Sequence, residues 1–467
     1  FTDLHPLASA WALFDAGQYA NGLAASLPLV GEAKQLGFRP LEAETLFLVG
    51  TCQRLTNDFV VAEASLEGAT LAAEAGRDDV IAAKSWAALV TLVGYQERRL
   101  DEGERLLSRA SAAAERLARV DEVELAYVRA LGNLRTAQGR YEESLDAFER
   151  GLGLARKLYG PESPLTANLL STSGRAIEEL GRVEEALVRY QKANATLERS
   201  VGPWHPDLSA GWEDVGVALA LLGRHDEAAA ALEHGAKIAR RSLGEESFPL
   251  ASIEGELGNE YRALGRTQLA GASFVRAIAI TEKILGPDHS DVARHLANYS
   301  ILRRTEGKID EAIALRRRAL AIEEKAVGPE HPRLANMLLN LGNVLYEKGD
   351  DERALAHQRR ALAIYEKALG SVHHNVALAL MNISASLRAQ GKFEEALAAA
   401  MRAWKIDQQA LRPEHPELTL TRIELGHALA GIGRYREALA HLERALDLRE
   451  ADATAGPQDL AEPRFAI

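Results

Sequence analysis

Apolar side chains recur at spacings of three and four residues along most of the chain, which is the pattern of helices with one buried face. Between Pro332 and Gly370 a first stripe consists of Leu334, Leu338, Leu341 and Leu345. Gly349, Asp350 and Asp351 interrupt it, and a second stripe follows with Ala354, Leu355, Ala361, Leu362, Ile364 and Tyr365. The alternation expected of a strand is absent from the sequence. The segment therefore predicts two antiparallel helices joined by a tight turn.

This two-helix pattern repeats every 42 residues. The glycine that opens each turn recurs at Gly139, Gly181, Gly223, Gly265, Gly307, Gly349, Gly391 and Gly433. Weaker turns near Gly17, Asn57 and Arg98 precede them at spacings of 40, 41 and 41 residues. A fixed period of this length is typical of a solenoid built from one supersecondary unit. We expect an all-α chain with three divergent units over 1–120, eight regular units over 121–450 that continue them, and a flexible tail over 451–467.

The repeated residues resemble the tetratricopeptide repeat, in which a Leu-Gly pair in the first helix is followed by Gly-x-Tyr-x-x-Ala at the turn. Leu341-Gly342 and Leu131-Gly132 match the first part, and Gly433-Arg434-Tyr435-Arg436-Glu437-Ala438 matches the second. The 42-residue length, with Gly328-Pro329-Glu330-His331-Pro332 between units, is similar to the kinesin-light-chain subtype. The resemblance implies about eleven helix-turn-helix units in a right-handed α-solenoid superhelix, with the first helix of each unit on the concave side.

Composition and charge narrow the classes of function. The chain has 467 residues, of which 47% are hydrophobic, and its formal net charge is −12. A surplus of negative charge repels phosphate backbones, so we expect no nucleic-acid partner. No apolar run reaches the length of a membrane helix, and no signal peptide is apparent, so we expect no membrane partner. The single cysteine, Cys52, excludes an intramolecular disulfide and favours a reducing, cytoplasmic location. We expect it to be a small buried residue.

Motifs that carry catalysis or cofactor binding are missing from the sequence. Neither a phosphate-binding loop nor a nucleophile elbow, zinc-protease helix or kinase motif occurs, so we expect no catalytic residue and no cofactor. The same repeat position holds His205, His289, His331, His373 and His415, with Ser163 and Ser247 in the remaining units. Equivalent positions on stacked helices lie too far apart to share a metal ion. We therefore interpret these histidines as helix caps or loop-packing residues and predict no metal site.

Two other features suggest structural roles. Gly244, Gly286, Gly328 and Gly370 each end a second helix, and we expect them to adopt the left-handed αL conformation. The basic run Arg316-Arg317-Arg318, with Arg359-Arg360 one unit later, lies in second helices beside glutamates. We expect it to form a solvated face of mixed charge.

Polar residues on the inner face of the first helices are the candidate binding surface. Asn340 and its neighbours stand opposite the leucine stripe, and asparagine is a mediocre helix former, so its recurrence there indicates another role. A carboxamide both donates and accepts, as holding a peptide backbone requires, and arginine favours acidic ligands. The predicted peptide groove comprises Asn259, Arg262, Arg294, Asn298, Arg304, Asn336, Asn340, Asn343, Asn382 and Arg388. An acidic groove patch is expected at Glu213, Asp214 and Glu256.

Three functions remain open at this point. The first is a non-catalytic scaffold that binds a protein or peptide in the concave groove. The second is the sensory or regulatory part of a larger protein, because the chain begins at Phe1 and resembles the C-terminal arrays of bacterial multidomain signalling proteins such as serine/threonine kinases. The third is a peptide-sensing regulator. The sequence names neither the ligand nor the pathway.

Overall fold

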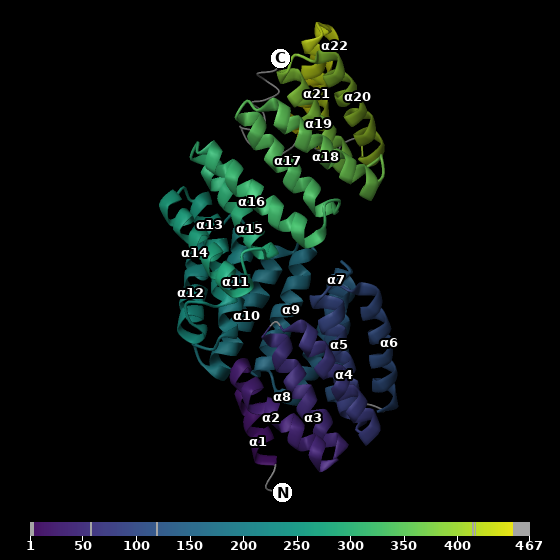
Figure 1. Ribbon diagram of the computed structural model, residues 1–467, viewed down its shortest axis with the longest axis vertical. Helices are drawn as coiled ribbons and strands as arrows, with labels where there is room; N and C mark the ends of the chain where they lie inside the picture. Colours follow the sequence, from purple (N-terminus) through teal and green to yellow (C-terminus); the bar gives the residue numbers. More distant parts are fainter. Residues whose placement is uncertain (1–3, 57, 118–119, 413–414, 416, 452–467) are drawn as a thin grey trace. The chain divides into compact units, whose positions relative to one another are not determined.

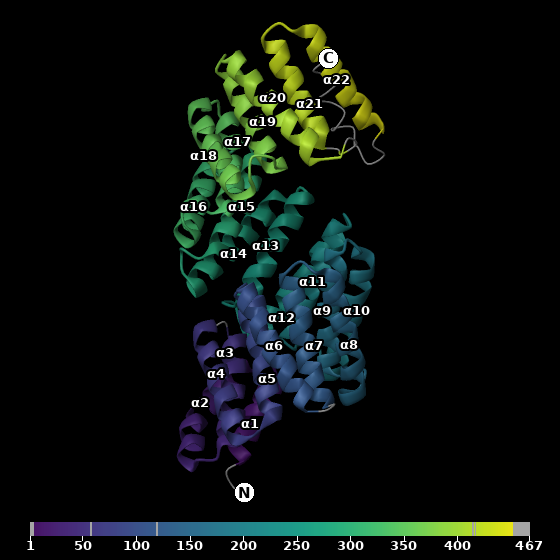
Figure 2. The same cartoon turned by 90° about the vertical axis from the view of Figure 1, so that its right-hand side faces the viewer.

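The computed structural model describes residues 4–56, 58–117, 120–412, 415 and 417–451. Within these residues the chain forms 22 α-helices and one π-helical segment, with no strand (Figures 1 and 2). The helices follow one another in eleven successive pairs, so the expected all-α repeat architecture is confirmed. Of the expected tail over 451–467, Ala451 is the last residue of the final helix and the remainder lies outside the described residues.

The chain divides into two compact units, residues 1–264 and 265–467. Within unit 1 each helix packs against the next one along the chain. The third pair is unusual because its first helix, α5, continues into a π-helical segment, η1. The helices of unit 1 are α1 Leu4–Asp15, α2 Tyr19–Leu36, α3 Arg39–Leu55, α4 Phe59–Gly76, α5 Asp79–Leu89, η1 Val90–Gln96, α6 Leu100–Arg116, α7 Asp121–Ala137, α8 Tyr141–Tyr159, α9 Pro164–Glu179, α10 Val183–Val201, α11 Asp207–Leu221, α12 His225–Leu243 and α13 Phe248–Ala263.

Unit 2 is built in the same way, with successive helices packed side by side. Its helices are α14 Thr267–Leu285, α15 Ser290–Thr305, α16 Ile309–Val327, α17 Pro332–Glu347, α18 Asp351–Leu369, α19 His374–Ala389, α20 Phe393–Ala410, α21 Glu417–Gly431 and α22 Tyr435–Ala451. The buried core contains the predicted stripe, since Leu334, Leu338 and Leu341 are fully buried and pack with Ala354 and Ala361 of the paired helix. Burial of such leucine and alanine faces is the main stabilising contribution in arrays of this kind.

Small residues let the paired helices approach closely. A Cβ atom at Gly342 would lie 3.0 Å from Cγ of Gln358 and 3.3 Å from the carbonyl oxygen of Ala354. In unit 1 the Ser144 hydroxyl donates to the carbonyl oxygen of Gly132 over 2.9 Å, which also requires close contact. Larger residues at these positions would push the helices of a pair apart.

The glycines that end the even-numbered helices differ from the sequence expectation. Gly370 has φ 81° and ψ 171°, and Gly328 has φ 86° and ψ 160°. The positive φ agrees with the prediction, but the αL assignment is wrong because ψ is extended rather than near +45°. This backbone region is open essentially to glycine alone. It directs the chain into the next repeat, and it recurs at Gly160, Gly202, Gly244 and Gly286.

The repeated histidines cap the helices that follow them, as expected. Nδ1 of His331 accepts a hydrogen bond from the backbone N–H of Arg333 over 3.2 Å, and His373 does the same with Asn375 over 3.1 Å. The same bond occurs at His205, His289 and His415. Among the described residues no cluster of three potential metal ligands is found. Cys52 is also buried as expected, and burial raises the pKa of its thiol to about 11.

The basic run on α16 is only partly the solvated face that the sequence suggests. Arg317 and Arg318 are exposed, and Arg318 forms an ion pair with Glu282 on α14. Arg360 pairs with Glu324 over 2.7 Å, and Arg402 pairs with Glu366, so the same Glu–Arg pair recurs at a spacing of 42 residues. Arg316 contradicts the expectation, because it is only 9% exposed. It faces the neighbouring helices, and burial lowers its pKa.

Among the described helices, none is both long enough and apolar enough to cross a membrane.

Candidate functional site

The odd-numbered helices line the inner side of each unit. In unit 1, α3 contacts α5, α5 contacts α7, and α11 contacts both α9 and α13. In unit 2, α19 contacts α17 and α21. Contacts between every second helix require these helices to converge, so they lie on the inside of the curve that each unit follows. This places the candidate groove residues, which all belong to odd-numbered helices, on the side where a ligand would be surrounded.

The asparagines of α17 form one polar stripe in unit 2. Asn336, Asn340 and Asn343 are spaced four and three residues apart and therefore share one side of the helix. Asn336 is exposed, whereas Asn340 and Asn343 are half-buried. The Asn340 carboxamide donates to the side-chain oxygen of Asn336, so these two residues are linked to each other.

Two further asparagines extend this stripe across neighbouring helices. Asn298 on α15 and Asn382 on α19 occupy the same repeat position as Asn340, 42 residues before and after it. Both are half-buried. Within the part of the chain that the structure describes, the side chains of Asn298, Asn343 and Asn382 make no hydrogen bond. Unit 2 therefore presents three carboxamides with unused donors and acceptors on successive inner helices.

The arginines predicted for unit 2 are already paired with carboxylates. Arg304 Nε lies 2.9 Å from Glu347 Oε2 on α17, and Arg388 donates two hydrogen bonds of 3.1 Å to Glu424 on α21. Arg294 contacts Asp291 in its own helix over 3.4 Å. The bonds to Glu347 and Glu424 tie each inner helix to the next one. An acidic ligand would have to displace one of these two glutamates before Arg304 or Arg388 could bind it.

The candidate residues of unit 1 are likewise joined to their neighbours. Asn259 donates to Glu256 over 3.2 Å within α13. Asp214 accepts from the Ser171 hydroxyl over 2.8 Å and from Arg175 over 3.1 Å and 3.2 Å. Arg262 is half-buried, and its Nε has no hydrogen-bond partner among the described residues.

Glu213 is the most perturbed acid of the acidic groove patch. Its carboxylate accepts from the Ser252 hydroxyl over 2.6 Å, and the side chain lies deep between α11 and α13. Burial, with the negative charges of Asp214 and Glu256 nearby, raises the pKa of Glu213 to about 7. Its charge therefore changes near neutral pH, and the acidity of this patch depends on conditions.

Comparisons with known proteins agree with this architecture. Models of the tetratricopeptide repeat match residues 122–199, 249–322, 300–367 and 375–451, and a second model of the repeat matches residues 213–249. The chain belongs to the tetratricopeptide repeat family. No curated protein matches it at a significant level.

Several solved structures are similar to this tetratricopeptide repeat protein. The apo form of RapI has a TM-score of 0.55 at 13% identity, covering 77% of this chain and 95% of RapI. BtubC (BKLC) from P. vanneervenii has a TM-score of 0.43 at 20% identity, covering 50% of this chain and 94% of that one. A putative kinesin light chain from Podosopora anserina has a TM-score of 0.40 at 23% identity, covering 45% of this chain and 99% of that one. At these identities the likeness concerns the fold alone.

Sequence reasoning missed three inner-face arginines of unit 1, namely Arg54, Arg129 and Arg175. Arg175 is paired with Asp214, as described above. Arg54 stands three residues before its turn residue Asn57, as Arg262, Arg304 and Arg388 stand three residues before their turn glycines. Alignment of the divergent repeats on this offset would have identified Arg54. Arg129 has no equivalent arginine in the other regular repeats, so the periodicity contains no signal for it.

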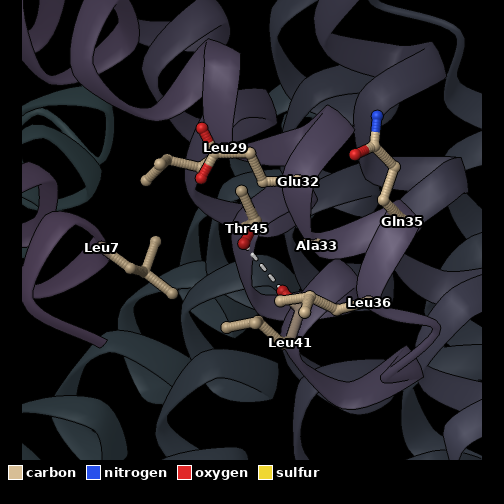
Figure 3. Close-up of a pocket in the computed structure, with 8 residues that line it drawn as sticks. All are labelled: Leu7, Leu29, Glu32, Ala33, Gln35, Leu36, Leu41 and Thr45. Carbon is tan, nitrogen blue, oxygen red and sulfur yellow. Dashed lines mark hydrogen bonds between the residues drawn. The ribbon is translucent and has the colours of Figure 1, made fainter. Parts of the chain in front are cut away.

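A small hollow of about 280 Å³ lies between the first three helices (Figure 3). Its lining is largely apolar, with Leu7 from α1, Leu29 and Leu36 from α2 and Leu41 from α3. The Thr45 hydroxyl donates to the Leu41 carbonyl oxygen over 2.7 Å and is not free for a ligand. We interpret this hollow as a packing gap of the tetratricopeptide array.

Proposed function

We propose that this tetratricopeptide repeat protein is a non-catalytic scaffold that binds an extended or short helical protein segment along the inner face of its odd-numbered helices. The observation that carries the proposal is the set of three unused carboxamides, Asn298, Asn343 and Asn382, on successive inner helices of unit 2. A carboxamide can donate to a peptide carbonyl and accept from a peptide N–H, so a row of them suits a main chain regardless of its side chains. The paired arginines beside them would hold the helices in register and add acidic preference only when displaced.

The expected affinity follows from the strength of such bonds. Each hydrogen bond contributes about 0.5–1.5 kcal/mol net, so several must act together to reach about micromolar binding. The alternatives raised by the sequence, a regulatory region of a larger bacterial kinase and a peptide-sensing regulator, would use the same surface. The proposal also places the protein in the cytoplasm, where a single buried thiol stays reduced.

The test is a binding titration with a defined probe. A random dodecapeptide display library is selected on the whole chain, and the strongest peptide is titrated by calorimetry against wild type and the double variant Asn343→Ala/Asn382→Ala. We expect the double variant to bind about tenfold more weakly or worse, since two hydrogen bonds are lost. Its thermal midpoint should stay within about 2 °C of wild type, because these side chains make no hydrogen bond to the described residues.

The matched control is Gln408→Ala/Gln409→Ala, which removes two exposed carboxamides from the even-numbered helix α20. This control should bind like wild type. Equal binding by both double variants would refute the role of the inner asparagines. Turnover of a phosphoryl or acyl substrate that follows the purified chain would refute the non-catalytic assignment.

A further inference from the structure

Two arginines on the inner face of unit 1 lack the carboxylate partners that the other inner arginines have. Arg54 ends the last turn of α3, and Arg129 lies in the middle of α7. Both side chains are half-buried, and Nε of Arg54 is fully buried with no hydrogen-bond partner. Neither arginine forms an ion pair or side-chain hydrogen bond with any residue that the structure describes. Arg175, Arg304 and Arg388 show by contrast what a satisfied arginine looks like on this face.

The two guanidinium groups lie near one another although they belong to different helices. Burial lowers the pKa of Arg54 to about 10, and the positive charge of Arg129 acts in the same direction. Arg129 faces inward, since Asn133 one turn later donates to Thr91 Oγ1 of η1 over 3.3 Å. Burying two like charges without a counter-charge is unfavourable and is normally avoided. Such an arrangement is suited to an anion that arrives from outside.

The first helical pair closes unit 1 on this side. The hydroxyl of Tyr19, at the start of α2, donates to Asp207 Oδ1 at the start of α11 over 3.4 Å, although the two residues are 188 positions apart. A Cβ atom at Gly17 would lie 3.0 Å from His205 and Pro206, so the backbone of the first turn touches the loop between α10 and α11. Figure 1 shows α1 and α2 (purple) reaching this region. The closure limits the access of water to the inner face near Arg54.

A hollow of about 800 Å³ lies at this closure. Its lining combines apolar and polar side chains, among them Tyr19, Asn21, Leu55, Trp204, His205 and Leu243. Leu55 directly follows Arg54, which places the hollow beside the arginines. Binding pockets for small ligands commonly have volumes of this size. The hollow has room for the side chains next to an anionic group.

We propose that Arg54 and Arg129 form a binding site for an anionic group, carboxylate or phosphate, carried by a peptide whose adjacent side chains enter the hollow at the closure of unit 1. Guanidinium groups bind both anions through paired, charge-assisted hydrogen bonds. The site is independent of the asparagine stripe in unit 2. With a net charge of −12, the chain as a whole repels anions, so preference for an acidic peptide must come from a local feature.

The experiment is calorimetric titration of the whole chain with three nonapeptides of alanine and glycine. They differ only at the centre, which carries three glutamates, three phosphoserines or three glutamines. We expect both anionic peptides to bind at least tenfold more tightly than the glutamine peptide, and the tighter of the two identifies the anion as carboxylate or phosphate. Arg54→Gln and Arg129→Gln should each weaken anionic binding at least fivefold, and added salt should do the same.

Three matched variants distinguish binding at this site from charge attraction elsewhere on the chain. Arg182→Gln, which removes an exposed arginine paired with Glu185, should bind the anionic peptides like wild type. Asn343→Ala/Asn382→Ala should also leave their binding unchanged, because the asparagine stripe belongs to unit 2. Arg54→Lys should retain part of the binding because it keeps the charge.

Thermal stability provides a readout that a structural arginine would move in the other direction. Removing an unpaired buried charge relieves an unfavourable interaction, so the melting temperature of Arg54→Gln should equal or exceed that of wild type. A lower melting temperature for Arg54→Gln would overturn the proposal, as would equal binding of the glutamine and anionic peptides. Unchanged anionic binding in both arginine variants would overturn it as well.

Discussion

At the scale of single residues, Gly328 shows how one backbone conformation maintains the repeat. The residue has φ 86° and ψ 160°, and nothing lies within 4 Å of the position where a Cβ atom would stand. Packing therefore leaves room for a methyl group, and glycine is required there only by the backbone torsion. Its N–H donates to the Glu324 carbonyl oxygen over 2.9 Å, which closes α16 before the chain turns toward α17.

We expect Gly328→Ala to lower the free energy of unfolding by about 1–3 kcal/mol, because an L-residue is strained in this region of φ and ψ. The matched control is Gly153→Ala, at an exposed helical position in α8 with nothing within 4 Å of the added methyl group. That control should raise stability by up to about 1 kcal/mol, because alanine is the better helix former. Urea unfolding of both variants checks this prediction. Equal effects of the two substitutions would show that the torsion at Gly328 is not under strain.

At the scale of helices, polar side chains tie elements that the leucine core already holds together. His374, the first residue of α19, is an example in unit 2. Its Nδ1 lies 3.0 Å from Asp407 Oδ1 on α20, and its Nε2 lies 3.1 Å from Glu417 Oε2 on α21. Asp407 is fully buried, so the imidazole reaches a carboxylate that water does not. The hydrogen bond to Asp407, with the negative charges of Asp407 and Glu417, raises the pKa of His374.

This tie makes stability depend on pH. The folded-state pKa of His374 lies above its unfolded value, so its contribution is fully present below about pH 6.5 and is lost as pH rises through the folded-state pKa. We expect His374→Gln to lower the free energy of unfolding by about 1–3 kcal/mol more at pH 5.5 than at pH 9. Urea unfolding at the two pH values measures the difference. A pH-independent effect would show that the histidine acts through its shape alone.

His295 provides the opposite case and serves as a control for this measurement. It is buried, and burial lowers its pKa to about 4. Its neutral form is the folded one, so stability falls as pH drops from about 6.5 toward 4. His295→Leu should therefore reduce the loss of stability in acid, whereas His374→Gln should increase it. The two variants should shift the pH profile of unfolding in opposite directions.

At the scale of the whole chain, the sequence period accounts for most of the fold. A strict 42-residue repeat predicts the helix pairs, their turns, the capping histidines and the odd-numbered helices as the inner set, because each of these depends on neighbouring units only. The torsion of Gly370 was predicted in sign but not in ψ, since a sequence pattern reports the need for glycine and not the exact region it occupies. Arg316 was misjudged because charge composition does not show which side of a helix faces its neighbours.

The candidate site was less predictable for a related reason. The asparagines of α15, α17 and α19 share one repeat position and could be found from the period. The pairing of Arg304 with Glu347 and of Arg388 with Glu424 depends on side-chain reach between helices, which periodicity does not encode. The neighbourhood of Arg54 and Arg129 depends on the accumulated rotation of several units. No local pattern contains that quantity.

The contact between Tyr19 and Asp207 has a consequence for how unit 1 folds and is synthesised. Helix packing in this unit joins near neighbours in sequence, and domains rich in such short-range contacts fold fast. The Tyr19–Asp207 bond spans 188 residues, so the entropy of closing the intervening loop opposes it until the helices between are in place. On the ribosome the first helix pair emerges early and waits for α11 before it finds its partner. The enclosed arginine site is therefore completed last in folding and should be the first part lost when unit 1 begins to unfold.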